Sequence, residues 1–226
     1  MGRQSHRILK VNVPMSEEKI APFDKLSQEY DQWFDRHQAI FDSELEALRK
    51  VIPTKGIGLE VGVGTGRFAA AFGIKFGLDP SQAMLDIAKS RGIEVSKGVA
   101  ESLPFEDAFF DFVLIVTTLC FVDNPLKALS EVKRVLKSGG LLIIGMIDRN
   151  SALGKNYEAK KQDNPFYRNA HFYSAEEEIQ LINQLGFIQK EIYQTIFLSL
   201  DAIKTIEPVK LGYGEGGFVV IKALKQ

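Results

Sequence analysis

Short apolar runs alternate with segments of helical periodicity through most of the chain. The apolar runs have the length of strands, and the segments between them place apolar residues every three or four positions, as a half-buried helix does. The five runs that we expect to be strands are residues 57–63, 74–78, 93–98, 111–116 and 141–147. Alternation of this kind predicts a parallel sheet with right-handed crossovers and helices on both faces.

The end of the chain departs from this alternation. Residues 187–200 and 216–224 both have the pattern of strands, and no obvious segment of helical length separates them. They are therefore expected to form an antiparallel pair that closes the sheet. The predicted fold is α/β: a Rossmann-like, doubly wound, mostly parallel seven-stranded sheet with an antiparallel C-terminal strand pair.

The residues before the first strand are expected to form an arm and two helices. Residues 1–22 mix charges with prolines, which is typical of an extended or partly ordered arm. A helix is expected from Asp24, and a second one over residues 43–51, ended by Pro53. The residues on the shared face of the first helix are Leu26, Tyr30, Trp33, Phe34 and His37. Its aromatic side chains either fasten the helix to the main domain or form the roof of a small-molecule site.

Two further segments bear on the site. The helix after Gly66 is expected to be short, because Gly73 follows after only six residues, and Ser81 is expected to cap a helix over residues 82–90. Residues 151–173 mix polar and aromatic side chains without a clear period. A long irregular segment inside a domain is typical of a functional lid, and a surface insertion is the alternative.

Composition and charge exclude several classes of protein. The chain has 226 residues, 45% hydrophobic and 25% charged, as ordinary globular proteins have. A net charge of −1 does not favour a nucleic-acid partner. The single cysteine, Cys120, gives no disulfide framework and no metal cluster. No signal peptide begins the chain, and its longest apolar run, residues 112–122, is about half a membrane span. We therefore expect a cytoplasmic protein with no membrane partner and no metal; the oligomeric state stays open.

Three glycines at alternate positions follow the first expected strand. Gly62, Gly64 and Gly66 form a loop in which the backbone can bend sharply and approach a ligand. Asp79 stands at the end of the second strand, where a carboxylate can accept both hydroxyls of a ribose. The loop lacks the third glycine of the dinucleotide fingerprint, since Arg67 occupies that position, and it is not a P-loop.

With these elements in place, the stretch from about Gly58 to Asp148 resembles the class I S-adenosylmethionine-dependent methyltransferases. The likeness is to their small-molecule branch, of the ubiquinone and menaquinone biosynthesis type, and extends to the C-terminal helix. The motifs that carry it are Leu59-Glu-Val-Gly-Val-Gly-Thr-Gly-Arg67, Gly77-Leu-Asp-Pro-Ser81 with Met84-Leu85, Ala100-Glu-Ser-Leu-Pro-Phe105, Phe110-Asp-Phe-Val113, Glu131-Val-Lys-Arg-Val-Leu-Lys-Ser-Gly-Gly140, Tyr173-Ser-Ala-Glu-Glu and Leu185-Gly-Phe187.

The resemblance implies how the chain holds the methionine part of its cofactor, S-adenosylmethionine. Gly62 and Gly64 let the backbone approach it, and Glu60 orients the loop or holds a water near the amino group. The carbonyl of Val116 or Thr117 accepts from the methionine ammonium.

The resemblance also implies which residues hold the nucleoside part of the cofactor and which cover its carboxylate end. Asp79 takes the ribose hydroxyls, while Pro80 and Met84 flank the adenine. A backbone N–H around Ala100-Glu101 reads the adenine edge. Tyr30 and Trp33 are expected to cover the carboxylate end from the N-terminal helix.

The chain departs from the family pattern at two places that concern chemistry. Val99 stands where relatives often carry an adenine-binding Asp, and Cys120 and Phe121 stand where many carry histidines. A sulfonium is a strong methyl donor, so a base is needed only when the nucleophile holds its proton. His171 and His37 are weak candidates for that base, and a lid or surface position is the alternative for each.

The hypothesis that follows is a methyltransferase (EC 2.1.1.-) acting on N, O or C of a small molecule by in-line displacement. A catalytically inactive or regulatory S-adenosylmethionine-binding protein is the alternative, and a nicotinamide oxidoreductase is a distant third. The parts of the single expected domain, 1–226, are the arm and helical lid (1–52), the cofactor-binding core (53–150), the lid or substrate insertion (151–173) and the C-terminal helix and strands (174–226).

Overall fold

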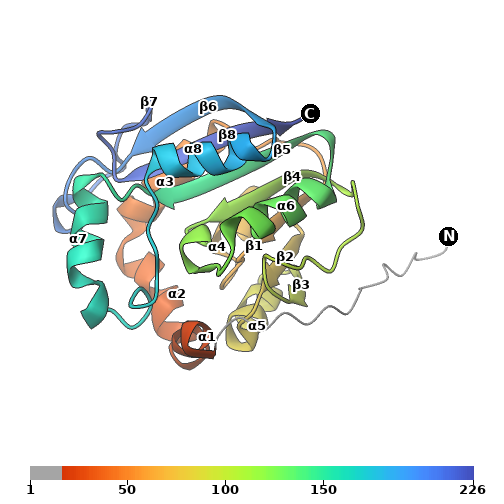
Figure 1. Cartoon of the computed structure of the whole chain (residues 1–226). Coiled ribbons are helices and arrows are strands. Elements are labelled where there is room, and N and C mark those ends of the chain that lie inside the picture. Colours follow the sequence, from red (N-terminus) through yellow and green to blue (C-terminus); the bar gives the residue numbers. More distant parts are fainter. Residues whose placement is uncertain (1–16) are drawn as a thin grey trace.

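The computed structural model describes residues 17–226. All of the strands in this part of the chain belong to one continuous sheet (Figure 1). Its strands lie in the spatial order β3-β2-β1-β4-β5-β8-β6-β7. In chain order they are β1 (Gly58–Val61), β2 (Phe76–Asp79), β3 (Glu94–Lys97), β4 (Phe110–Val116), β5 (Leu136–Ile147), β6 (Phe187–Thr195), β7 (Lys210–Leu211) and β8 (Phe218–Lys225).

The pairing of the strands confirms the predicted fold class. The five strands β1 to β5 are mutually parallel, and β8 lies antiparallel between β5 and β6. The antiparallel C-terminal pair is therefore present. Strand β7 has only two residues and pairs with the edge of β6, so the sheet has one short strand beyond the seven predicted.

Helices cover both faces of the sheet. They are α1 (Glu17–Lys25), α2 (Ser27–Arg36), α3 (Gln38–Arg49), α4 (Arg67–Phe72), α5 (Gln82–Ser90), α6 (Pro125–Val135), α7 (Ala152–Lys160) and α8 (Ala175–Gln184), with 3₁₀ turns at η1 (Leu119–Phe121), η2 (Lys161–Asp163) and η3 (Leu200–Ala202). Buried residues of α6 and α8 pack on one face, and those of α3, α4 and α5 pack on the other. Within the described chain, none of these helices has the length and apolar character needed to cross a bilayer.

Strand β4 lies at the centre and, from Phe112 to Val116, is apolar along both of its faces. Val113 and Ile115 belong to the core under α6 and α8, while Phe112 and Leu114 belong to the core under α3, α4 and α5. Successive side chains of a strand point to opposite faces, so a strand covered on both sides tends to be apolar at successive positions. This is why residues 112–116 form an uninterrupted apolar run in the sequence.

The N-terminal part is more helical than the sequence suggested. Helix α1 covers residues 17–25, which include the end of the expected arm; residues 1–16 lie outside the described residues. Pro22 has no N–H to give to the carbonyl of Glu18, and that carbonyl instead accepts from the side chain of Asn169 at 3.4 Å. A break at Leu26 then separates α1 from α2.

Two other segments also differ from expectation. Helix α3 begins at Gln38, earlier than the expected residue 43, and α7 lies inside the segment that was expected to be irregular. The side chain of Ser151 caps α7 by accepting from the N–H of Gly154. Gly154 is the one buried residue of α7. A helix that buries so little has no apolar stripe, and its sequence therefore shows no helical period.

The core beneath α6 gives a test of stability. Phe110 is fully buried and contacts the rings of Phe76, Phe105 and Phe109. We expect Phe110→Ala to lower the free energy of unfolding by about 3–5 kcal/mol, because a large cavity replaces these contacts. Leu211→Ala, at a residue 74% exposed, should change it by less than about 0.5 kcal/mol. Urea denaturation measures both, and equal effects would contradict this account of the core.

Candidate functional site

The glycine loop joins β1 to α4 at the carboxyl edge of the parallel strands. Gly62, Gly64 and Gly66 have φ angles of 74°, 51° and 82°, a region that side chains with a Cβ rarely adopt. The N–H of Gly62 donates to the carbonyl of Leu78 at 2.7 Å. A Cβ on Gly62 would meet the Thr118 side chain at 2.1 Å. The bend is therefore fixed by contacts with β2 and with the end of β4.

Gly64 differs from the other two glycines because space lies beside it. A Cβ placed there would have only a Tyr30 ring carbon within 4 Å, at 3.9 Å. A Cβ on Gly66 would lie 2.4 Å from Ile93 and 3.1 Å from Ala88. Gly66 thus serves close packing of the chain, whereas Gly64 leaves its backbone open toward a cavity.

Asp79 ends β2 and faces the same cavity. Its Oδ2 accepts from the N–H of Gly64 at 2.9 Å, and its Oδ1 accepts from the N–H of Ser81 at 2.9 Å. Burial raises the pKa of this carboxyl to about 6, the two hydrogen bonds oppose the rise, and the charge of Asp24 adds to it. Each oxygen retains a free lone pair, so the ionised group can accept two further hydrogen bonds.

Glu60, in β1, supplies an unsatisfied polar atom beside the loop. Its side chain is 1% exposed, and its Oε2 has no hydrogen-bond partner among the residues described. Burial and the charge of Asp79 raise the pKa of this carboxyl well above its ordinary value. A buried acceptor without a partner is costly to the fold unless a ligand or a water satisfies it.

A cavity of about 80 Å³ lies over the glycine loop. It reaches from the loop to Pro80 and Met84, and helix α1 covers it. The residues that line it are Lys19, Ile20, Phe23, Tyr30, Gly62, Gly64, Asp79, Pro80, Ser81, Met84, Val116, Thr117, Thr118 and Phe121. Lys19 fastens α1 across the opening, because its ammonium donates to the carbonyl of Phe121 at 3.0 Å and to Asp123 at 2.6 Å.

The end of β4 forms the floor of this cavity. Thr117 has a φ of 45°, which is rare for a residue with a branched side chain and is typical of functional positions. Its carbonyl accepts from the Cys120 thiol at 3.4 Å, and the Val116 carbonyl accepts from the Thr118 hydroxyl at 2.8 Å. Each carbonyl keeps one lone pair for a further donor.

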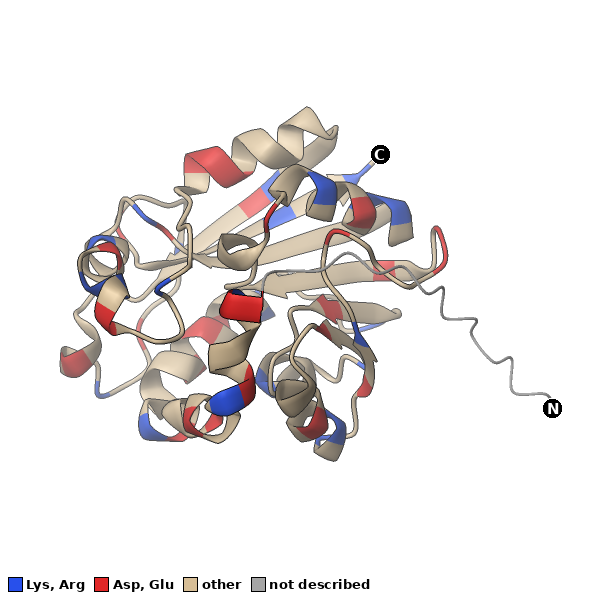
Figure 2. Ribbon diagram, turned by 60° about the horizontal axis from the view of Figure 1, so that its bottom comes forward, with Lys and Arg blue, Asp and Glu red and all other residues tan. Residues whose placement is uncertain are grey.

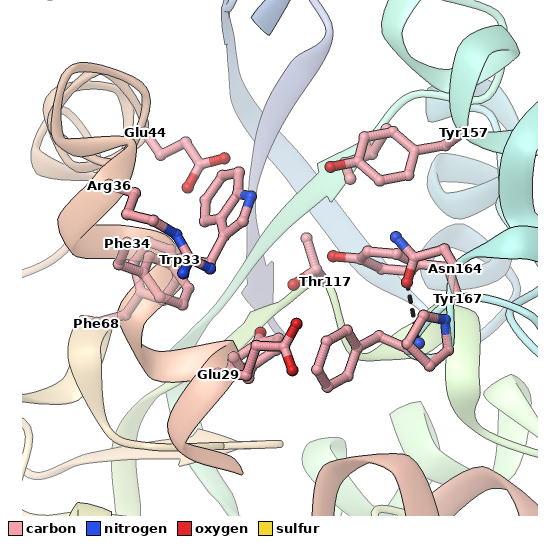
Figure 3. A pocket seen from close by; sticks show the side chains of 14 residues that line it. Glu29, Trp33, Phe34, Arg36, Glu44, Phe68, Thr117, Tyr157, Asn164 and Tyr167 are labelled. Atoms are coloured by element: carbon pink, nitrogen blue, oxygen red, sulfur yellow. Dashed lines mark hydrogen bonds between the residues drawn. The ribbon is translucent and has the colours of Figure 1, made fainter. Parts of the chain in front are cut away.

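A second and larger cavity, of about 250 Å³, lies between α2 and α3 on one side and the segment from α7 to residue 167 on the other (Figure 3). Aromatic rings make most of its wall, and two carboxylates and one guanidinium are added to them. The residues that line it are Glu29, Tyr30, Trp33, Phe34, Arg36, Glu44, Phe68, Thr117, Ile147, Tyr157, Asn164, Pro165, Phe166 and Tyr167.

The two cavities meet at a common wall. Tyr30 and Thr117 line both of them. Tyr30 packs edge-on against Phe23 of α1 and against Phe166. A group bound in the smaller cavity and a molecule bound in the larger one would therefore approach each other beside these two side chains.

Helix α2 is fastened to the glycine loop by ion pairs. The Arg67 guanidinium donates to Asp31 at 2.8 and 2.9 Å and to Asp35 at 2.6 and 2.9 Å. Arg91 donates to Asp31 and to the carbonyl of Thr65 within the loop. Hydrogen bonds from Arg67, Thr65 and Arg91 hold the pKa of Asp31 at about 2, although its partial burial opposes this. These contacts place Tyr30 over the loop.

Comparison with known proteins identifies the family. Residues 59–144 match the family model described as a methyltransferase domain. A crystal structure of an S-adenosylmethionine-dependent methyltransferase of Thermotoga maritima, described as a possible histamine N-methyltransferase, superimposes with a TM-score of 0.89 at 48% identity. The match covers 92% of this chain and all of that one. The chain belongs to the class I S-adenosylmethionine-dependent methyltransferases.

Two other relatives differ in how much of this chain they match. An uncharacterized protein of Methanocaldococcus jannaschii is 55% identical over 203 residues, which are 90% of this chain and 98% of that protein. The demethylmenaquinone methyltransferase of Bacillus licheniformis is 33% identical over 138 residues, which are 54% of this chain and 59% of that enzyme.

Most residues that the sequence assigned to the cofactor lie together in this methyltransferase. Asp79, Pro80 and Met84 line the smaller cavity with Gly62, Gly64 and the end of β4, whereas Gly66 does not line it. Tyr30 lines both cavities, whereas Trp33 lines the larger cavity and not the smaller one. The predicted cofactor contacts themselves stay predictions.

Other predicted residues lie elsewhere. Ala100 is buried in the core under α6, and the carboxylate of Glu101 accepts from the N–H groups of Asp123 and Asn124 at 2.8 and 3.2 Å. That carboxylate therefore holds the start of α6, and an adenine contact by the nearby backbone stays a prediction.

The two histidines proposed as weak base candidates lie outside the lining of both cavities. His37 stacks on Trp33 with ring centroids 4.5 Å apart, and its Nδ1 lies 2.8 Å from the carbonyl of Trp33. His171 is exposed and packs on Tyr173. Burial raises the pKa of the Cys120 thiol, which does not favour a nucleophilic thiolate. A base role for either histidine stays a prediction.

Sequence reasoning missed Glu44 and the contribution of α1. Glu44 occupies the apolar face of α3, one turn from Phe41 and from Leu48, which are both buried. A single acid on an otherwise apolar helical face was the available signal. Lys19 gave no such signal, because it falls in the segment 1–22 that was expected to be an arm, and Phe23 lies between that segment and the helix expected from Asp24.

Asp79 also predicts a dependence of stability on pH. Its folded pKa of about 6 lies above its ordinary value of 3.8, so between these values the folded chain binds more protons than the unfolded chain. Its contribution to stability is thus present at about pH 4 and is lost as the pH rises through 6. The loss should be about 2 kcal/mol between about pH 4 and pH 7.

Urea titrations of the wild type and of Asp79→Asn at the two pH values measure this contribution. Asn loses one of the two hydrogen bonds at every pH, so the two proteins differ in unfolding free energy even without ionisation. Only the change with pH in this difference reports the ionisation of Asp79. Asp201→Asn, on the exposed turn η3, is the matched control and should show no such change. A difference between wild type and Asp79→Asn that stays constant with pH would refute the buried carboxylate.

Proposed function

We propose that the chain transfers the methyl group of S-adenosylmethionine to a small molecule. The observation that carries this proposal is the meeting of the two cavities at Tyr30 and Thr117, one built on the glycine loop and the other walled by aromatic rings. A donor in one cavity and an acceptor in the other would meet beside these two residues. Alignment of the acceptor atom with the S–CH₃ bond of the donor is the main requirement of methyl transfer.

The residues of the smaller cavity fit S-adenosylmethionine. The open backbone at Gly64 suits a close approach, and the free lone pairs of Asp79 suit two ribose hydroxyls. The unsatisfied Oε2 of Glu60 and the carbonyls of Val116 and Thr117 suit an ammonium and the water around it. When bound, S-adenosylmethionine would supply a methyl group that its positively charged sulfur releases readily to a nucleophile.

The larger cavity favours a small acceptor. Its volume of about 250 Å³ lies below the usual range for drug-sized ligands. Positive and negative residues are interspersed along the ribbon of the described chain, as Figure 2 shows, and this distribution does not favour a polyanionic acceptor. The description of the Thermotoga relative as a possible histamine N-methyltransferase adds an amine to the acceptors worth testing.

The methyltransferase proposal predicts that S-adenosylhomocysteine, the demethylated product, raises the melting temperature. At a concentration 100 times its Kd, a ligand of the folded state adds about 2.7 kcal/mol of stability. We expect Asp79→Ala to weaken binding at least about 10-fold, because two ribose hydroxyls lose their acceptor. Asp201→Ala should bind as the wild type does. Thermal shift and calorimetry measure both.

Transfer itself is measured with labelled S-adenosylmethionine and a panel of small amines, phenols and thiols. Labelled product that depends on the acceptor supports the enzyme, whereas binding without transfer to any acceptor would favour the regulatory alternative. Unchanged binding by Asp79→Ala would refute the assignment of the ribose site.

A further inference from the structure

Glu44 is a carboxylate in an aromatic cavity with no partner. It lies on α3, and its side chain points into the space opposite Tyr157 and Tyr167 (Figure 3). Among residues 17–226, no hydrogen-bond donor or cation contacts Glu44. Helix α3 has the opposite arrangement on its outer side, where Glu46 pairs with Arg49 at 3.3 Å. The position of Glu44 is therefore not explained by the stability of the helix.

Three phenol groups share the space into which Glu44 points. The charge of Glu44 contributes to raising the pKa values of Tyr30, Tyr157 and Tyr167, although burial is the larger cause for each. These hydroxyls come from opposite walls of the cavity. Beside the aromatic rings, the cavity is lined by the carboxylates of Glu29 and Glu44, the guanidinium of Arg36, and the hydroxyls of Thr117 and the three tyrosines.

These features together suit an organic cation. An ammonium is attracted to the faces of aromatic rings, and most strongly to that of Trp, as well as to a carboxylate in a poorly solvated site. Trp33 lines the cavity beside Glu44, and Phe34, Phe68 and Phe166 add further rings. A neutral acceptor would leave the ionised form of Glu44 without a charged partner, and an anionic one would be repelled by that form.

We propose that the acceptor is a small amine that enters as its ammonium ion, and that Glu44 selects it by charge. This inference rests on the proposed function. The ammonium gives one proton to the Glu44 carboxylate, and the freed nitrogen lone pair forms the new N–CH₃ bond. The S–CH₃ bond of the donor breaks, its electron pair stays on sulfur, and the methylated nitrogen carries the positive charge.

The ionisation of Glu44 supports this assignment and gives it a pH signature. Although Glu44 is half-buried and not fully enclosed, desolvation of its carboxyl raises its pKa to about 8, so a bound cation must first displace a proton at neutral pH. The other titratable or charged groups facing Glu44 are Glu29, Tyr30 and Arg36 of α2, Tyr157 of α7 and Tyr167. Glu29 and Arg36 are exposed to solvent, and the three phenols stay neutral over the range tested.

Choline and its neutral isostere 3,3-dimethylbutan-1-ol test the charge selection, since the two have the same shape and neither can donate a titratable ammonium proton. Their Kd values are measured by calorimetry on the full chain with saturating S-adenosylhomocysteine, and again without it. We expect choline to bind at least 10-fold more tightly than the alcohol. Its affinity should rise toward pH 8, by up to 10-fold per pH unit.

The Glu44→Gln substitution should weaken the binding of choline at least 10-fold and abolish the pH dependence of its Kd. The Kd of the alcohol should stay within about 2-fold of the wild-type value. Glu46→Gln, on the same helix, is the matched control and should behave as the wild type does. An unchanged shift of the melting temperature by S-adenosylhomocysteine shows that each variant is folded. It also separates the inference from the proposed function, which depends on that binding and on transfer to any acceptor.

Equal affinities of choline and the alcohol for the wild type would overturn the inference. So would equal effects of the two Gln variants on choline, or methyl transfer to phenols and not to amines. In the last case the proposed function would be retained, and the proposed role of Glu44 would be rejected.

Discussion

The ion pairs around Arg67 are the constraint on which the rest of the site depends. Arg67 opens α4 directly after the glycine loop, and its guanidinium holds both Asp31 and Asp35 of α2. Its side chain is 15% exposed, and that of Asp31 is 14% exposed. Charges so far removed from water are costly without their partners, and breaking such a pair typically costs about 3–5 kcal/mol. The position of α2 is thus coupled to the loop that it covers.

The same residue shows what local sequence patterns reveal and what they miss. In the sequence, Arg67 served only to exclude the dinucleotide fingerprint. In the structure, Gly66 already provides the close helix packing that the third glycine of that fingerprint provides, since a Cβ there would contact Ile93 and Ala88. Arg67 is therefore free to extend toward α2, and only the folded chain brings its two aspartates within reach.

Features set by neighbouring residues were predictable. The glycine spacing gave the positive φ angles, the apolar run gave β4, and the Ser81 cap gave α5 with its predicted bounds of residues 82–90. Asp79 was placed correctly beside the loop, because parallel strands end at a common edge. Features set by distant contacts were not predictable. Helix α7 buries too little to show a period, and the role of Glu44 depends on walls contributed from residues 157–167.

The common wall of the two cavities has a consequence for how such a protein can change. Tyr30 and Thr117 belong to both cavities, so a substitution at either one alters the two cavities together. Trp33, Glu44 and Tyr157 line only the larger cavity, and their elements lie outside the glycine loop. Under the proposed function, selection for a new acceptor can therefore act on these residues while the cavity for the donor stays constant. The larger cavity can then change its specificity independently of the smaller one, except at the two side chains that, among residues 17–226, line both.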